Sequence, residues 1–431
     1  MLASRPDSML RHLFLLTTLT SLAMADDYFV STSGNDTASG AKDSPWRTLQ
    51  HACDTLKAGD TAHVLSGTYH EKIRFRSSGK PGAPITLKAD GAAVISGQGV
   101  EGENIVLIEN LSHIRLVGFE IRDNLKARDG SGVRVRGSGS HIEIRNCRIH
   151  EIRGKDAMGI TIYGTSDTPI SDLIIDGNEI FNCDPARSEA LTLNGNVMGF
   201  QVTNNFVHDV NNIGIDFIGG EAWVGRNPAN VTRQGVCKGN RVVRCRSNYE
   251  GGYAAGIYVD GGRDIVVEDN LVMECDLGIE VGAENKGTVT SGVTVRNNRI
   301  FLNDKAGLVF GGYDKNASRV KGCVFTGNTC YRNDQHKKDQ NGELWIQAAS
   351  ENKVTSNTFW AGEESPLVQV DPAAGDNVID KNRYFSEAGS QDSYFNWRGG
   401  DVDGFSSWKR FSKQDAGSVF ERPEIQLPAV K

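Results

Sequence analysis

An asparagine recurs along most of this 431-residue chain at a spacing that few folds accommodate. It lies in the pattern apolar-x-apolar-x-x-Asn-x-apolar, at Asn146, Asn178, Asn205, Asn240, Asn270, Asn298, Asn328, Asn357 and Asn382. The gaps run from 25 to 35 residues, with a mean near 29.5. A period of about 20–50 residues is typical of solenoids, in which each repeat stacks on the next. We therefore expect a stack of similar coils.

Each repeat contains short segments with the alternation of β-strands. One run precedes the asparagine, as in Ile142–Ile144, and a second follows it by about twelve residues. The second runs cover residues 160–162, 191–193, 215–217, 257–259, 279–281, 308–310 and 344–346. Short strands without helical segments between them, stacked coil on coil, predict an all-β, single-stranded parallel β-helix of about ten coils. We expect the asparagines to occupy a turn position with a left-handed or bridge backbone and to hydrogen-bond one another along the axis.

The two ends of the repeat region have the features of caps. Residues 45–56 have helical apolar spacing and are expected to cover the first coil, because an open solenoid end needs covering. From Tyr384 the period stops and aromatic residues cluster. We therefore predict a β-helix domain over 26–383 that includes its N-terminal cap, and an aromatic-rich C-terminal cap over 384–431.

The N-terminal residues have the pattern of a signal peptide. Arg11 and His12 precede the apolar run 13–19, and Ala23-Met24-Ala25 offers a small-x-small cleavage site. Segment 1–25 is thus expected to be removed, giving a secreted, extracellular or periplasmic protein. The apolar run is too short to span a bilayer, so no membrane association is expected.

The net charge and the cysteine content argue against two further kinds of protein, nucleic-acid-binding and zinc-binding proteins. The net charge of −7 argues against a nucleic-acid partner, and we expect a monomer. The eight cysteines include no CxxC pair, which disfavours zinc. Cys245 and Cys275 are expected on neighbouring coils, either as buried thiols or as a disulfide.

Alternation along the second runs defines a column of outward-facing residues, at the second and fourth position of each strand. Three carboxylates, Asp216, Asp260 and Glu280, fall on three successive central coils of this column. Their flanking positions hold Arg134, Tyr163, Asn194, Tyr258 and Trp345.

The spacing of these carboxylates is that of a glycoside-cleaving pair. With coils about 4.8 Å apart, Asp260 is expected roughly 8 Å from both other acids. Such spacings suit inverting hydrolysis, and side chains that lean together suit the retaining mechanism. Mutual repulsion should keep one carboxyl protonated, as a general acid requires. The alternatives are a calcium site formed by Asp216, Asp260 and Glu280, or a solvated acidic surface.

Insertions next to this column are expected to form the walls of a groove. The longest repeat carries an extra loop with Glu221 and Trp223, and the next carries Tyr253 just before its outward strand. Glu284 follows the strand of Glu280. Aromatic walls suit the apolar faces of sugar rings.

Several segments resemble secreted right-handed parallel β-helix proteins of the pectin-lyase-like superfamily. They are YFVSTSGND at 28–36, PWRTL at 45–49 and GTY at 67–69. The stretch GIYVDGG at 256–262, followed by GIE at 278–280, is similar to β-helix glycoside hydrolases of the lacto-N-biosidase and β-xylosidase types. The resemblance implies a right-handed coil and a poly- or oligosaccharide substrate, and nominates Asp260 and Glu280 as catalytic acids.

The chain departs from other members of that superfamily. The outward column lacks lysine, whereas pectate lyases use an arginine or lysine base with calcium; Arg263 lies only in the turn after Asp260. We predict a glycoside hydrolase without cofactor. A calcium-dependent uronate lyase and a non-catalytic glycan-binding solenoid remain as alternatives.

Overall fold

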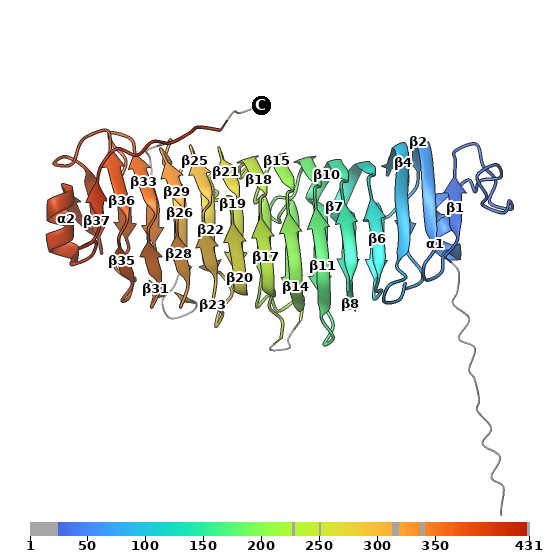
Figure 1. Cartoon of the computed structure of the whole chain (residues 1–431), viewed down its shortest axis with the longest axis horizontal. Coiled ribbons are helices and arrows are strands. Elements are labelled where there is room, and N and C mark those ends of the chain that lie inside the picture. The colour runs from blue at the N-terminus through green and yellow to red at the C-terminus, as the bar shows by residue number, and fades with distance from the viewer. Residues whose placement is uncertain (1–24, 226–228, 250, 313–318, 337–340, 429–431) are drawn as a thin grey trace, which may run out of the picture.

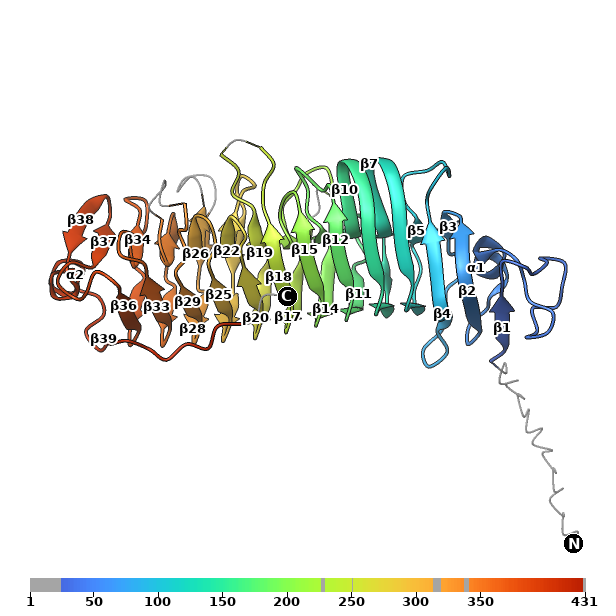
Figure 2. The same ribbon diagram turned by 90° about the horizontal axis from the view of Figure 1, so that it is seen from above.

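The computed structural model is a long right-handed β-helix of about 11 turns, close to the number that the repeat predicts. Figures 1 and 2 show the coils stacked along one axis from the N-terminal to the C-terminal end. The structure describes residues 25–225, 229–249, 251–312, 319–336 and 341–428. Most of the expected signal peptide, residues 1–24, lies outside these ranges. The predicted all-β parallel β-helix is confirmed.

Three parallel sheets run along the stack, and each coil adds a strand to each of them. The site sheet contains β3 (Ile73–Arg74), β5 (Val106–Glu109), the ends of β7 (Glu120–Arg136) and β10 (Arg148–Gly164), β13 (Leu191–Gly195), β16 (Ile215–Ile218), β19 (Ala255–Asp260), β22 (Leu277–Ala283), β26 (Ala306–Gly312), β30 (Leu344–Ile346), β34 (Val368–Val370) and β37 (Tyr394–Trp397).

The second sheet contains β1 (Asp27–Val30), the starts of β2 (Thr61–His70) and β4 (Ile85–Ser96), β6 (Ile114–Val117), β9 (Ile142–Arg145), β11 (Ile170–Asp176), β14 (Val197–Thr203), β17 (Arg233–Lys238), β20 (Arg263–Glu268), β24 (Thr294–Arg296), β28 (Val324–Thr326), β32 (Lys353–Thr355) and β35 (Val378–Asp380). Short strands β8 (Gly139–Ser140), β23 (Val289–Ser291), β27 (Arg319–Lys321) and β31 (Ala349–Ser350) extend it.

The third sheet contains the ends of β2 and β4, the starts of β7 and β10, then β12 (Glu179–Cys183), β15 (Phe206–Val210), β18 (Arg241–Cys245), β21 (Leu271–Met273), β25 (Arg299–Phe301), β29 (Thr329–Tyr331), β33 (Thr358–Ala361), β36 (Arg383–Ser386) and β39 (Val419–Phe420).

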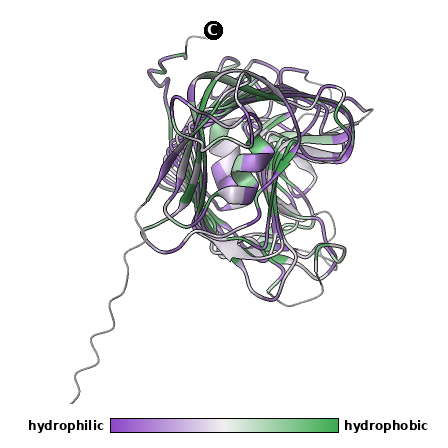
Figure 3. Ribbon diagram, turned by 90° about the vertical axis from the view of Figure 1, so that its right-hand side faces the viewer, coloured by the Kyte–Doolittle hydropathy of each residue, from purple (hydrophilic) through white to green (hydrophobic). Residues whose placement is uncertain are grey.

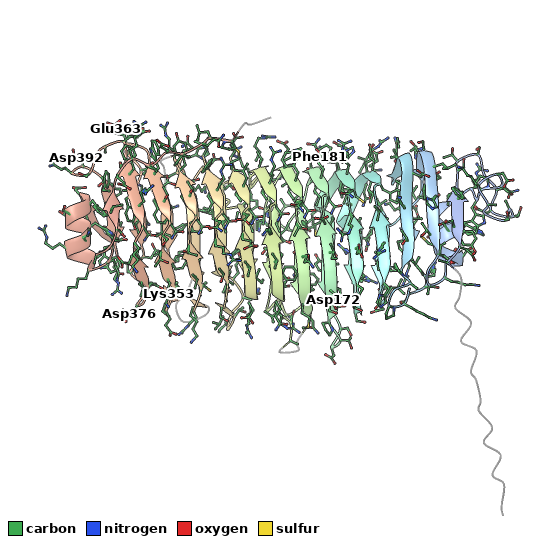
Figure 4. The ribbon with its side chains drawn as sticks, viewed as in Figure 1. Asp172, Phe181, Lys353, Glu363, Asp376 and Asp392 are labelled. Atoms are coloured by element: carbon green, nitrogen blue, oxygen red, sulfur yellow. The ribbon has the colours of Figure 1, made fainter. Side chains whose placement is uncertain are left out.

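Apolar side chains fill the space that the three sheets enclose. Along the site sheet, Leu193, Phe217, Val259 and Val281 are fully buried and belong to one continuous core cluster. Viewed along the axis, the coils superpose into one outline (Figure 3). Polar side chains cover much of the outside of the stack. Of the residues labelled in Figure 4, Asp172, Lys353 and Asp376 lie along one edge of the stack, and Phe181 and Glu363 lie along the opposite edge. Burial of this apolar surface is the main driving force for folding.

The asparagine column forms the expected ladder at the corner between the second and third sheets. Asn270 Nδ2, for example, donates to Asn298 Oδ1 at 3.0 Å, and Asn240 Nδ2 donates to Asn270 Oδ1 at 3.0 Å. The left-handed alternative was wrong by one residue: Asp269, directly before the ladder residue, has φ 55°. In the first repeat Asn146 takes that left-handed position, and the backbone N–H of Cys147 donates to Asn178.

Glycines at the start of the site-sheet strands are required by space. A Cβ on Gly278 would lie 2.2 Å from Ile300 Cγ2, and one on Gly256 would lie 2.3 Å from Val272 Cγ1. These glycines therefore allow the coil wall to approach the neighbouring turn closely.

Both caps are present, but the C-terminal boundary differs from the prediction at residue 384. Helix α1 (Leu49–Thr55) begins after Thr48, whose side chain accepts a hydrogen bond from the His51 N–H. At the other end β36 and β37 still pair as coils, so the stack continues beyond residue 383. The C-terminal end of the stack consists of β38 (Gly400–Asp403), helix α2 (Phe405–Ser412) and a buried aromatic cluster around Trp408.

The disulfide alternative for Cys245 and Cys275 was wrong. All eight cysteines are buried free thiols. Within the described part of the chain, no helix has the length and apolar character needed to cross a membrane.

Candidate active site

The predicted carboxylates meet near the middle of the site sheet. Strand register places Asp216 of β16 beside Tyr258 of β19, and Tyr258 beside Glu280 of β22. Asp260, at the end of β19, lies opposite Gly282. Their core-facing neighbours, such as Phe217 and Val281, pack inward, so the acidic side chains point to the opposite face of the sheet.

These three acids are covered, whereas the outward column was expected to be solvent-facing. Asp216 is 2% exposed, Glu280 4% and Asp260 5%. The extra loop after β16 folds back toward the sheet through a bridge between Gly219 and Val231. Burial of carboxyls without cations makes their ionisation costly.

Electrostatics show how closely the acids interact. Burial, followed by the charge of Glu284, raises the pKa of Asp260 to about 8. Burial, followed by Glu284 and Asp260, raises the pKa of Glu280 well above its usual range. Burial and then Glu189 and Asp260 do the same for the pKa of Asp216. At neutral pH this group therefore retains protons that exposed carboxyls would have lost.

Backbone and side-chain donors hold individual acids in place. The N–H of Phe217 donates to Asp216 Oδ1 at 2.6 Å, and that of Glu284 donates to Asp260 Oδ1 at 2.7 Å. The Tyr258 hydroxyl donates to Glu284 Oε1 at 3.3 Å, so Glu284 belongs to the same site. These contacts orient the acids for interaction with a ligand.

The N-terminal wall of the site contains three of the predicted substrate-binding residues. The guanidinium of Arg134 lies 5.1 Å from the ring centroid of Tyr163 and binds Asp129 at 2.9 Å. Trp223, which is 63% exposed, contacts Tyr163 edge-on with centroids 5.1 Å apart. Because the charge of Arg134 is already paired with Asp129, the surface that this wall offers to a ligand is formed mainly by the rings of Tyr163 and Trp223.

Asn194 and Glu221 link this wall to the extra loop. Asn194 Nδ2 donates to Glu221 Oε2 at 2.6 Å, and Asn194 itself is buried. The carbonyl of Glu221 accepts from Asn230 Nδ2 at 2.7 Å. The loop is thereby fixed beside the carboxylates.

The C-terminal wall contains two aromatic residues that the sequence indicated. Tyr253 is 39% exposed, and its ring centroid lies 6.4 Å from that of Trp345. Together with Glu280 they line a cavity of about 330 Å³.

Arg263 is not brought into the cluster. It begins β20 on the second sheet, where its Nε donates to the carbonyl of Val289 at 3.4 Å. The calcium alternative for Asp216, Asp260 and Glu280 stays a prediction. Among the described residues no set of three or more His, Cys, Asp or Glu is arranged to hold a metal ion.

Sequence reasoning missed Glu189 and Asp371, and it did not select Gln347 as a site residue. Burial, followed by the charge of Glu221, raises the pKa of Glu189 to about 8, and the charge of Glu189 in turn acts on Asp216. Glu189 lies just before β13, outside the alternating positions of that strand. Gln347 follows β30 directly and holds the fourth position of its strand, which belongs to the outward column.

The chain matches known proteins along most of its length. Residues 28–226 match the family described as Pel9A-like, right handed beta helix region, and residues 201–384 match that described as Periplasmic copper-binding protein (NosD). The chain is 34% identical over 417 residues to the uncharacterized protein YwoF of Bacillus subtilis (strain 168), covering 92% of this chain and 88% of YwoF. A shorter match, 36% identical over 85 residues, is to pectate lyase PEL9 of Emericella nidulans and covers 19% of this chain and 20% of that protein.

Solved structures share the fold at low identity. A lacto-N-biosidase from Eubacterium ramulus has a TM-score of 0.64 at 15% identity, over 83% of this chain and 67% of that chain. An exopolygalacturonase from Yersinia enterocolitica has a TM-score of 0.63 at 15% identity, over 87% of this chain and 78% of that chain. The Streptococcus pneumoniae adhesin PfbA has a TM-score of 0.58 at 12% identity, over 82% of this chain and 88% of that chain. The fold is thus one shared by carbohydrate-active enzymes and an adhesin.

Proposed function

The chain belongs to the family of YwoF and folds as a right-handed parallel β-helix, and we propose that it is a glycoside hydrolase acting on a poly- or oligosaccharide. The observation that carries this proposal is the group of buried carboxyls on the site sheet. Asp260 has a pKa of about 8, so its carboxyl holds a proton at neutral pH. A protonated carboxyl beside other acids is what glycosidic cleavage requires.

The roles follow from protonation and position. Asp260 donates its proton to the glycosidic oxygen as that bond breaks. Glu280, on the adjoining strand, is the second carboxyl; because its pKa is raised as well, it has to give up its own proton before it acts as the base for water or as the nucleophile. Asp216, whose pKa is raised by burial, Glu189 and Asp260, influences the protonation of the other two acids or binds a substrate hydroxyl.

Strand geometry sets the separation of the acids. Backbones of adjacent strands lie about 4.8 Å apart, and diagonal positions across them are roughly 8 Å apart. Asp260 and Glu280 are a diagonal pair of this kind. Carboxyl groups that keep this separation would fall within the inverting range of about 6.5–9.5 Å, and carboxyl groups that lean together would reach the retaining range of about 5–5.5 Å. Proton NMR of the first-formed anomer distinguishes the two mechanisms.

Location and assembly are further parts of the proposal. The positively charged and apolar N-terminal residues followed by Ala23-Met24-Ala25 support export through a cleaved signal peptide. An exported monomer would meet glycans outside the cytoplasm. N-terminal sequencing of the secreted chain tests this; a mature N-terminus near Asp26 is expected.

A uronate lyase is the second candidate, supported by the 85-residue match to a pectate lyase. It predicts an unsaturated product that absorbs in the ultraviolet and activity that a calcium chelator abolishes. A non-catalytic solenoid, which the fold of the adhesin supports, predicts binding without turnover.

The test is a glycan panel assayed for both new reducing ends and ultraviolet absorbance. Hydrolysis produces reducing ends alone, and the Asp260→Asn variant should lose them. Asp172→Asn, an exposed carboxylate on the second sheet, is the matched control and should keep them. Ultraviolet-absorbing products would instead establish the lyase.

A further inference from the structure

The cavity beside Glu280 has the size and walls of a sugar subsite. Its volume of about 330 Å³ lies at the lower end of the range for small-molecule sites, about 300–1,000 Å³. It is lined by Glu280 on one side and by Trp345, Gln347 and Asp371 on the other. A space of this size takes a single ring better than an extended chain.

Trp345 gives the cavity a fixed aromatic surface. Its indole Nε1 donates to Asp371 Oδ1 at 3.0 Å, which sets the orientation of the ring. Tyr253 lies on the same wall, and Lys305 Nζ is 3.4 Å from the Tyr253 ring centroid. Aromatic rings held in this way can stack against the apolar face of a sugar.

Gln347 supplies an acceptor that the described protein leaves unused. Its side chain is 8% exposed and lines the cavity, and its Oε1 is buried without a hydrogen-bond partner among the described residues. A buried acceptor that makes no hydrogen bond destabilises the structure that holds it. A ligand hydroxyl or amide N–H in the cavity would satisfy this oxygen.

The charge of the wall selects against acidic sugars. The acidic wall residues are Glu280 and Asp371, and no lysine, arginine or histidine is among the described residues that line the cavity. Lys305, whose Nζ lies 3.4 Å from the Tyr253 ring centroid, is not one of the lining residues. Proteins recognise carboxylates mainly with arginine or lysine. The carboxylate of a uronate would here meet two carboxyl groups and no cationic lining residue to bind it.

We propose that this cavity is a subsite for one uncharged sugar ring, which stacks on Trp345 and donates a hydrogen bond to Gln347 Oε1, and that it excludes uronates. The inference rests on the proposed function only in that Glu280 belongs to both. It narrows the substrate class from glycans in general to neutral glycans.

Binding is measured by calorimetry on Asp260→Asn, so that turnover does not intervene. The probes are xylo-, cello-, galacto- and chito-oligosaccharides, with oligogalacturonates as the acidic set. At least one neutral series should bind, and Gln347→Ala or Trp345→Ala in the same background should weaken it at least tenfold. Oligogalacturonates should not bind.

A charge change at the rim keeps the test valid if the buried variants fail to fold. Ala373 is exposed and lines the cavity, so Ala373→Lys adds a cation without disturbing the core. It should allow oligogalacturonate binding, while the neutral Ala373→Gln should not.

The outcomes separate this inference from the hydrolase proposal. Neutral binding without turnover by the wild type contradicts the hydrolase and leaves the subsite intact. Turnover of a neutral glycan with affinity unchanged by Gln347→Ala and Trp345→Ala overturns the subsite alone. Oligogalacturonate binding to the parent, or no binding by any neutral series, also overturns the subsite.

Discussion

Two faces of this solenoid shift the pKa of carboxyl groups in opposite directions. On the third sheet, Asp209 accepts from Arg244 Nε at 2.6 Å and Nη2 at 2.8 Å, and this pairing lowers the pKa of Asp209 to about 2. On the site sheet, burial and Glu284 raise the pKa of Asp260 to about 8. Both residues belong to equivalent coils of one regular stack, so the fold alone does not dictate the difference.

The contrast shows in which part of the molecule the arrangement of acidic side chains lowers the stability of the fold. The second sheet also pairs its acids: Glu268 lies between Lys238 and Arg296, which lower its pKa. The site sheet instead brings acids together under covering loops. Clustered, strongly perturbed acids are characteristic of functional sites.

The largest expected difference between the faces is in catalysis. Asp260→Asn removes the proton donor and should lower kcat about a thousandfold, since general acids contribute roughly 10²–10⁴. Asp209 lies on another sheet, so Asp209→Asn should change kcat less than twofold. Rates on the best neutral glycan check both; equal losses would contradict the assignment.

The next difference is in stability against pH. A carboxyl with a raised folded-state pKa binds more protons when folded, so its contribution is lost as pH rises from about 4 to 8. Asp260→Asn should therefore be more stable than wild type at pH 8, by on the order of 5 kcal/mol, since the pKa rises by about four units and one pKa unit is worth about 1.4 kcal/mol. The two proteins should converge near pH 4. Urea unfolding at both pH values measures this.

The smallest difference concerns the paired acid. The pKa of Asp209 is lowered on folding, so its stabilisation is present above about pH 4 and is lost as pH falls through about 2. The pair is partly solvent-exposed, so Asp209→Asn should cost only about 1 kcal/mol at pH 7, and less at high salt. A stabilising effect at pH 7 would contradict the comparison.

Most of the fold was predictable because it is periodic. The ladder asparagines, such as Asn270, repeat once per coil and carry the stacking hydrogen bonds themselves. The left-handed residue of each coil lies directly before the ladder asparagine. The sequence did not identify it because Gly, Asp, Asn, Ser and Lys all occupy this position, as at Asp269 and Lys381. Such a position leaves no single-residue signature.

The site was predictable where it follows the strand alternation, as at Asp216, Asp260 and Glu280, and where an insertion borders that column, as at Trp223 and Tyr253. Glu189 lies before its strand, and its effect depends on how loops cover the sheet. Loop paths are set by tertiary contacts that a periodic pattern does not record.

The central claim is that a buried carboxyl on the site sheet holds a proton at neutral pH. Infrared spectroscopy in D₂O measures this directly, through the carbonyl stretch that only a protonated carboxyl shows. At pH 6.5 the wild type should show this band, and Asp260→Asn should show it reduced, whereas Asp209→Asn should leave it unchanged. Absence of the band in the wild type at pH 6.5 would contradict the account.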